Sequence, residues 1–468
     1  MTLQPQPVDR SLWFQAALLP DGWAQSVRIG LANGRIAGVE TGVERDAGDE
    51  GGGVALPGMT NLHSHAFQRA MAGLTEARGP EGQAGADDDF WSWRALMYRF
   101  LDRGGPEEIE AITALAFLEM LEGGFTRVCE FHYLHNAPSG QAYDDIAEIA
   151  GRVASAARTT GIGLTLLPVF YAHAGFGGQP PAHGQRRFIT DLDGFADLVG
   201  RCRDIAAGLD GAVVGVAPHS LRAVAPSELA TMPSLADGGP IHIHVAEQVR
   251  EVDDCLAWSG ARPVEWLLDH APVDARWCLI HSTHVTEAEW RGLADRKAVV
   301  GLCPVTEANL GDGVFPAADF LSAGGRFGIG TDSNVQIGVA DELRLLEYSQ
   351  RLTHRRRAVM ADARRSTGRA LYDQAQAGGA QAAGVDAAGL AVGAFADIVS
   401  LDVSGVAFAG RSRDAVLDSW LFAAPRGAVS SVWRAGREVV KGGRHVARDQ
   451  VEARYRQAVL RILNEGGA

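Results

Sequence analysis

The stretch GMTNLHSHAFQRAMAGL, residues 58–74, places two histidines two positions apart, shortly after the apolar residues 54–57. Side chains of a β-strand alternate between its two faces, so His63 and His65 should project from the same side of the strand. Two imidazoles on one side of a core strand can form part of a metal site, can be hydrogen-bonded polar packing or can have arisen by chance. The rest of the chain decides between these explanations.

Downstream of this stretch, β-rich segments that end in polar residues alternate with Ala-, Leu- and Glu-rich segments of helical period. One such helix should begin at Pro106 and end before Gly123-Gly124. Parallel strands need crossover helices, so this alternation predicts an α/β protein with a (β/α)₈ TIM barrel. An open doubly wound sheet is the alternative, but no Gly-rich dinucleotide loop follows the first strand. The predicted strands cover residues 59–65, 125–132, 164–171, 213–219, 240–246, 277–282, 298–303 and 326–331.

The two ends of the chain have another pattern, of short strands and turns. Asn33-Gly34 lies between alternating apolar segments and predicts a hairpin. We expect residues 1–56 and 386–445 to form one smaller β-sandwich-like domain, which the barrel of residues 57–385 interrupts, with a C-terminal helix in residues 446–468. The Gly- and Asp-rich residues 79–89 predict a mobile loop.

Composition narrows the class of function. The chain has 43 Lys and Arg against 57 Asp and Glu, a formal charge of −14, which would repel a nucleic acid and favours a small-molecule substrate. No apolar run approaches the ~20 residues that span a bilayer, and the N-terminus lacks the layout of a secretory signal, so we expect a cytoplasmic protein. The five cysteines form no CxxC pair, which predicts reduced and mostly buried thiols.

Ionisable side chains recur at the ends of the predicted strands, which is where a barrel carries its chemistry. Each has an alternative explanation: Asp332 can be a turn residue and His281 a helix cap, while His242 lies deeper in its strand and should be a hydrogen-bonded core residue. Together they predict a site for one divalent metal ion: three neutral imidazoles and a carboxylate suit Zn²⁺ or another divalent first-row metal, with Zn²⁺ expected, and the absence of clustered thiolates disfavours a structural zinc site. The predicted ligands are His63, His65, His244 and Asp332.

Several motifs carry a family resemblance. NLHSH (61–65), HIHVAE (242–247), HSTH (281–284) and GIGTDSN (328–334) resemble the metal-site motifs of the amidohydrolase superfamily. Glu247, three residues after the fifth-strand histidine, resembles the deaminase branch with one metal ion. No strand-end lysine stands where binuclear members carry a carboxylated lysine, which disfavours those branches.

Five further motifs resemble the formimidoylglutamate deiminase family: HSHAFQRAMAGLTE (63–76), FWSWRALMYR (90–99), EFHYLH (130–135), HSLRAV (219–224) and CPVTEANLGDG (303–313). The resemblance implies a metal-dependent hydrolase that converts N-formimino-L-glutamate and water into N-formyl-L-glutamate and ammonia in histidine degradation. It also implies a homodimer. Glu307 and Asn309 lie in the last motif, and the sequence assigns them no role beyond shaping a loop.

Hydrolysis at an amidine-like carbon needs a nucleophilic water, a base and an acid. We expect Asp332 to accept the water proton, Glu247 to protonate the imino nitrogen and His281 to orient the water. Two substrate carboxylates call for guanidinium groups, since these present paired donors. The candidates are Arg222 and Arg94, both placed in loops after strands, and the resemblance supports Gln68, Tyr133 and His219 as further substrate contacts.

Two other functions are consistent with the same residues. A different mononuclear deaminase of the superfamily would act on a purine, pyrimidine or guanidine compound, and its pocket would favour aromatic stacking over arginines. A non-catalytic scaffold would retain a metal for stability alone, and it would normally close every coordination position. Retaining both Glu247 and His281 beside the ligands argues for a catalyst.

Overall fold

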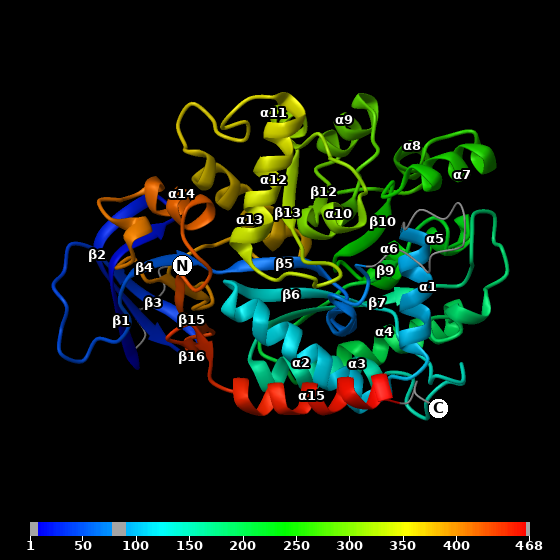
Figure 1. The fold of residues 1–468 in the computed structure, drawn as a ribbon, viewed down its shortest axis with the longest axis horizontal. Coiled ribbons are helices and arrows are strands. Elements are labelled where there is room, and N and C mark those ends of the chain that lie inside the picture. The colour runs from blue at the N-terminus through cyan, green and yellow to red at the C-terminus, as the bar shows by residue number, and fades with distance from the viewer. Residues whose placement is uncertain (1–7, 77–89, 465–468) are drawn as a thin grey trace.

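The structure, a computed structural model, describes residues 8–76 and 90–464 of the 468-residue chain (Figure 1). The predicted mobile loop at residues 79–89 lies outside the described residues. Dark blue, orange and red strands from the two chain ends gather at one side of the molecule, and strands that run from lighter blue through green to yellow, surrounded by helices, gather at the other. No described helix is long and apolar enough to cross a membrane.

Strands from both chain ends form a single eight-stranded sheet, in the order β17-β16-β15-β14-β4-β1-β2-β3. The antiparallel pairing of β4 with β14, from Val54↔Leu401 to Pro57↔Ile398, joins the two halves. The predicted hairpin is confirmed, because Asn33 and Gly34 connect β2 to β3 with φ of 50° and 75°. The strands are β1 (Arg10–Leu19), β2 (Gly22–Ala32), β3 (Arg35–Glu40), β4 (Val54–Pro57), β14 (Ile398–Leu401), β15 (Val429–Arg434), β16 (Arg437–Lys441) and β17 (Arg444–His445).

The remaining strands pair in parallel, which makes this an α/β fold. Isolated bridges Val216↔Ile241 and Ser220↔His244 connect the first parallel sheet to β10, and Ser64↔Asp332 connects β5 to the residues after β13. The pairing therefore leads from β5 to β13 and back to β5. These strands are β5 (Met59–Ser64), β6 (Phe125–His132), β7 (Gly163–Phe170), β8 (Val213–Val214), β9 (Ala217–Pro218), β10 (Ile241–Val245), β11 (Trp277–His281), β12 (Val299–Leu302) and β13 (Arg326–Ile329).

Helices alternate with the parallel strands and pack around them (Figure 1). The helices are α1 (Phe90–Leu101), α2 (Pro106–Glu122), α3 (Glu148–Thr160), α4 (Leu192–Ala206), α5 (Pro226–Leu229), α6 (Met232–Ala236), α7 (Val249–Ser259), α8 (Pro263–His270), α9 (Glu287–Asp295), α10 (Pro304–Leu310), α11 (Ala317–Ser322), α12 (Val339–His354), α13 (Thr367–Ala382), α14 (Asp414–Phe422) and α15 (Arg448–Asn464), with short 3₁₀ turns η1 (Ala66–Met71), η2 (His183–Gln185) and η3 (Val406–Phe408).

Helix α2 shows how the local sequence sets the two ends of a helix, and helix α15 packs against it. α2 begins at Pro106, as predicted, where Glu108 accepts a hydrogen bond from the backbone N–H of Gly105 at 3.2 Å. It ends before the Gly123-Gly124 pair. The red C-terminal helix α15 lies along α2, and Arg454 forms an ion pair with Glu110 at 3.1 Å (Figure 1).

Two sequence expectations differ from the structure. The fourth predicted strand, 213–219, is split into β8 and β9 by Gly215, where an added Cβ would lie 2.3 Å from the backbone oxygen of Pro240. The backbone there is too close to its neighbour for a regular strand with side chains. Arg94 lies on helix α1 and not in a loop, because the aromatic segment 90–99 packs as a helix over the strand ends.

Candidate metal centre and active-site cavity

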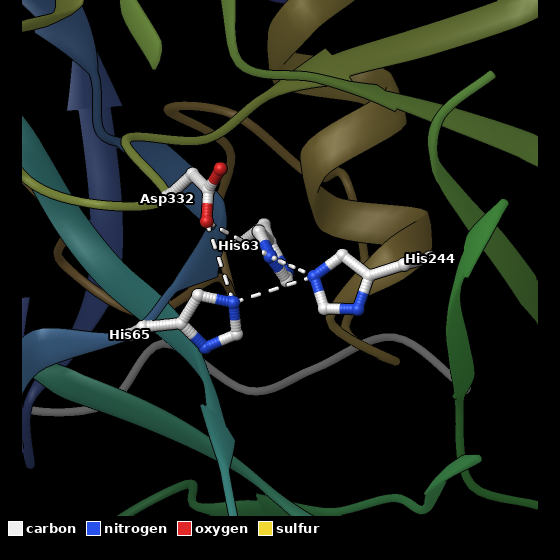
Figure 2. A group of neighbouring side chains, drawn as sticks. All are labelled: His63, His65, His244 and Asp332. Carbon is white, nitrogen blue, oxygen red and sulfur yellow. Dashed lines mark hydrogen bonds and ion pairs between the residues drawn. The ribbon is translucent and has the colours of Figure 1, made fainter. Parts of the chain in front are cut away.

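Four side chains from three strand ends converge on one point, and Figure 2 shows them. His63 and His65 come from β5 and the residue after it, His244 comes from β10, and Asp332 follows β13. The Nε2 atom of His244 lies 3.0 Å from Nε2 of His63 and 3.3 Å from Nε2 of His65. Oδ1 of Asp332 lies 3.4 Å and 3.3 Å from the same two histidine nitrogens. The four predicted ligands are thus brought together.

The proton positions in this cluster favour a cation. Nδ1 of His65 lies 3.1 Å from the backbone oxygen of Phe131, and Nδ1 of His244 lies 3.0 Å from the backbone oxygen of His219. A carbonyl oxygen only accepts, so both Nδ1 atoms carry the proton when these rings are neutral. The two Nε2 lone pairs then face each other with no hydrogen between them.

A metal ion would resolve this contact. Ligand atoms held at ~2.0–2.1 Å around a tetrahedral Zn²⁺ lie roughly 3.4 Å from one another. The separations of 3.0 to 3.4 Å among the four donor atoms are close to that value. Burial also keeps the imidazoles neutral, as a ligand must be, and lowers the pKa of His63 to about 3. The residues therefore fit a divalent metal ion.

Polar residues beneath the cluster hold Asp332 in place. Asn61 donates to the Thr331 hydroxyl at 2.6 Å and accepts from the Thr331 backbone N–H at 3.1 Å. Asn334 donates to the Ser64 hydroxyl at 3.2 Å and so ties the end of β13 to the end of β5. Asp332 itself has a left-handed φ of 45°, a conformation that surrounding contacts must maintain.

An acid and a further histidine lie beside the four donors. Nε2 of His281, at the end of β11, lies 3.7 Å from Oε1 of Glu247 and 3.8 Å from Oδ2 of Asp332. Burial raises the pKa of Glu247 to about 7, with Asp332 adding to the shift and His281 opposing it. Burial lowers the pKa of His281, whereas the neighbouring carboxylates Glu247 and Glu307 raise it. Glu247 is therefore suited to exchange a proton near neutral pH.

A cavity opens onto this acid and these imidazoles. Two arginines line it: Arg222 is 8% exposed with its Nη2 atom 3.9 Å from Glu251, and Arg94 lies with its guanidinium carbon 5.7 Å from the Tyr98 ring centre. The cavity therefore carries acidic groups on one part of its wall and cationic groups on another. The lining residues are His65, Gln68, Phe90, Trp93, Arg94, Met97, Tyr98, Tyr133, Tyr171, Phe188, His219, Arg222, His244, Glu247, His281, Leu310 and Asp332.

The cavity contains every substrate-contact candidate from the sequence. Gln68 donates to the Tyr133 hydroxyl at 3.0 Å, and its own side-chain oxygen is buried with no hydrogen-bond partner among the described residues. His219 presents its backbone oxygen to His244 and lines the cavity with its ring. His242 does not take part: its Nε2 atom bonds the backbone oxygen of Ala382 at 2.8 Å, as expected of a core histidine.

Residues 54–439 match the amidohydrolase family. The chain belongs to this family. Residues 12–53 of this amidohydrolase match the N-terminal domain of the formimidoylglutamate deiminase HutF. The chain is 49% identical over 460 residues to a formimidoylglutamate deiminase of Pseudomonas aeruginosa, covering 97% of this chain and 99% of that protein.

Solved structures agree with the assignment. A crystal structure of an amidohydrolase from Brucella melitensis has a TM-score of 0.93 and 55% identity, covering 97% of this amidohydrolase and 100% of that chain. An adenosine deaminase from Xanthomonas campestris with bound zinc has a TM-score of 0.82 at 23% identity, covering 98% and 100%. At that identity the second likeness shows the fold alone.

Sequence reasoning missed some residues of this amidohydrolase site. Tyr171 and Phe188 line the cavity, but isolated aromatic residues carry no sequence signal that separates a pocket wall from core packing. Glu307 contacts His281, although the sequence indicated no role for it beyond shaping a loop. Its position in a family-like motif was the only available signal.

Proposed function

We propose that this chain catalyses the metal-dependent hydrolysis of N-formimino-L-glutamate to N-formyl-L-glutamate and ammonia, a step of histidine degradation. One observation carries the proposal: a single cavity joins a buried metal-binding group and an acid to two arginines. Such a cavity complements a substrate with a reactive amidine-like carbon at one end and two carboxylates at the other. The identity to the curated deiminase over nearly the whole chain supports the same reaction.

The proposed ligands are His63, His65, His244 and Asp332, and the proposed ion is Zn²⁺. Imidazole nitrogens and a carboxylate are a donor set that Zn²⁺ accepts. When bound, such an ion lowers the pKa of water toward ~7 and so supplies a nucleophile at neutral pH.

The chain's own residues then move the protons. Oδ2 of Asp332 faces Nε2 of His281 and is placed to take a proton from the attacking water. Glu247, whose Oε1 also approaches Nε2 of His281, delivers one proton to the imino nitrogen, and the proton that Asp332 took from the water is the second, so that the nitrogen leaves as ammonia. His281 has both carboxylates near its Nε2 atom and orients the water through that nitrogen.

Substrate recognition falls to the cationic part of the cavity. Arg222 and Arg94 each bind a substrate carboxylate, because a guanidinium offers two parallel donors to a carboxylate. Gln68, Tyr133 and His219 complete the polar wall between the arginines and the reacting carbon. Local arginines are needed here, since the chain as a whole carries a formal charge of −14 and the substrate is anionic.

We also infer the finer organisation of the chain. The parallel strands β5 to β13, whose pairing returns to its start, form a (β/α)₈ barrel over residues 57–385. Residues 1–56 and 386–445 form a composite β domain, supported by the eight-stranded sheet to which both contribute strands, and 446–468 contain the terminal helix; the sandwich-like form of the β domain stays a prediction. A homodimer and a cytoplasmic location stay predictions.

Ammonia release tests the function directly. The purified protein, loaded with Zn²⁺, should release one ammonia per N-formimino-L-glutamate consumed and leave N-formyl-L-glutamate. Guanine, adenine and cytosine should give no release above background. Turnover of one of the bases in place of the formimino compound would reject the proposal, and stoichiometric metal with no turnover of any substrate would indicate a scaffold.

A further inference from the structure

Glu307 is a buried carboxylate that the proposed mechanism does not use. It lies on helix α10, which follows β12, and is 7% exposed. Its Oε1 atom lies 3.2 Å from Nδ1 of His281 and 2.8 Å from the backbone N–H of Cys303. The backbone of the same residue accepts a hydrogen bond from the N–H of Asp312 at 2.9 Å. Hydrogen bonds therefore hold both the side chain and the backbone of Glu307.

We propose that Glu307 is a positioning residue for the reaction. It keeps a proton on Nδ1 of His281 and fixes the ring orientation that directs Nε2 at the reacting water. The inference rests on the proposed function, and it assigns a partner to the histidine of that site. A carboxylate oxygen only accepts, so the short contact requires a proton on Nδ1.

The backbone of His281 explains why such a partner is needed. His281 and Ser282 have φ of 66° and 50°, so the chain leaves β11 in a left-handed conformation directly at the functional side chain. A half-turn of the ring about its Cβ–Cγ bond would exchange each nitrogen for a carbon. Only one orientation gives Nδ1 to Glu307 while Nε2 stays 3.7 Å from Glu247 and 3.8 Å from Asp332.

The geometry provides a variant that separates hydrogen bonding from charge. Both bonds of Glu307 go to Oε1, and one comes from a backbone N–H that cannot reverse its role. In Glu307→Gln the amide oxygen must therefore face Cys303, and the same oxygen still accepts from Nδ1 of His281. Glu307→Leu removes both bonds with a side chain of similar size.

Glu342, on helix α12, offers a matched control because its side chain contacts the same helix α10. Its Oε2 atom accepts the backbone N–H of Val305 at 3.0 Å, and it is fully buried. Glu342→Leu therefore removes a carboxylate cap from the first turn of α10, as Glu307→Leu does, but the bond it removes goes to Val305 and not to His281. A purely structural role of Glu307 predicts that the two leucine variants behave alike.

The test combines kinetics with histidine NMR on the Zn²⁺-loaded full chain. We expect Glu307→Leu to lower kcat at least about tenfold, the scale of a misplaced catalytic group, while its KM stays within about threefold of wild type. For Glu307→Gln and Glu342→Leu, kcat should stay within about threefold of wild type. ¹⁵N imidazole spectra, assigned with His281→Gln, should show a proton on Nδ1 of His281 in wild type and Glu307→Gln but not fully in Glu307→Leu. Metal content should not differ.

Three results overturn the inference: wild-type kcat in Glu307→Leu, equal losses in Glu307→Leu and Glu342→Leu, or an unchanged Nδ1 proton in Glu307→Leu. Failure of the proposed function is distinguishable, because then the wild type itself does not turn over N-formimino-L-glutamate. The NMR comparison still decides whether Glu307 sets the protonation of His281 in that case.

Discussion

The Asp49 group beside the eight-stranded sheet and the strand-end cluster both bury polar side chains, but their hydrogen bonding differs. Asp49, in the loop between β3 and β4, accepts hydrogen bonds from the Ser11 hydroxyl at 2.6 Å, from Nη2 of Arg28 at 2.9 Å and from the backbone N–H of Asp46 at 2.8 Å. In the cluster, the Nε2 lone pairs of His65 and His244 face each other at 3.3 Å, and the side-chain oxygen of Gln68 is buried with no hydrogen-bond partner among the described residues.

The difference separates structural from functional polarity. A buried polar group that finds all its partners within the chain contributes to stability, and one that lacks them costs free energy unless a ligand supplies the partner. The Asp49 group is complete in the folded chain. The strand-end cluster is complete only with a cation and a substrate, so changes in the two regions should affect different measurements.

The largest expected effect is in the cluster. Asp332→Asn should lower kcat/KM by about 10³-fold or more, since it removes a proposed metal ligand and the proposed proton acceptor together. The fold should persist, because the backbone oxygen of Asp332 still accepts from Asn334 at 2.9 Å. Ammonia release, bound metal and circular dichroism measure the three quantities. Near-wild-type turnover would remove Asp332 from the mechanism.

The sheet should show the opposite behaviour. Phe14 is fully buried and meets Trp433 edge to face with ring centres 5.7 Å apart. Phe14→Ala should lower the free energy of unfolding by about 3–5 kcal/mol through the cavity that it leaves. Urea unfolding measures this loss, while kcat per folded molecule should not change. A large drop in kcat at full folding would show that the two regions are coupled.

Arg222→Met tests the cationic wall of the cavity and should have a smaller effect than the loss of Asp332. Removing one charged contact to a substrate carboxylate should lower kcat/KM for N-formimino-L-glutamate at least about tenfold. Arg276→Met is a matched control, because Arg276 pairs with Asp274 at 2.9 Å and is absent from the cavity lining. Equal kinetics of the two variants would reject Arg222 as a substrate anchor.

The smallest expected effect is the pH dependence of the stability that Asp49 contributes beside the sheet. Hydrogen bonds from Arg28 hold the pKa of Asp49 well below its usual range, against the opposing effect of burial. A lowered folded-state pKa adds stability above the unfolded value of ~3.9, and that stability is lost as pH falls below it. The stability difference between wild type and Asp49→Asn should therefore be larger at pH ~7 than at pH ~3.5, as urea unfolding at both values would measure. A difference that does not vary with pH would contradict the assignment.

Local signals predicted much of the fold. The caps of α2 and the Asn33-Gly34 hairpin depend on neighbouring residues, and both were predicted correctly. The break in the fourth strand was missed, because Gly215 is constrained by the approach of Pro240 from a separate segment. The helical state of Arg94 was missed for a similar reason, since α1 packs over strand ends that lie far along the chain.

The candidate site also has a part that the sequence predicted and a part that only the structure shows. The sequence by itself determined the chemical types and their positions at strand ends: two histidines with the period of a strand, a third histidine and an aspartate after other strands. Only the tertiary structure decided that their donor atoms lie within 4.8 Å of one another, that Glu307 faces His281 and that two arginines share their cavity. The physical reason is that strand periodicity is a local property of the backbone, whereas distances between side chains from different strands depend on how the whole chain packs.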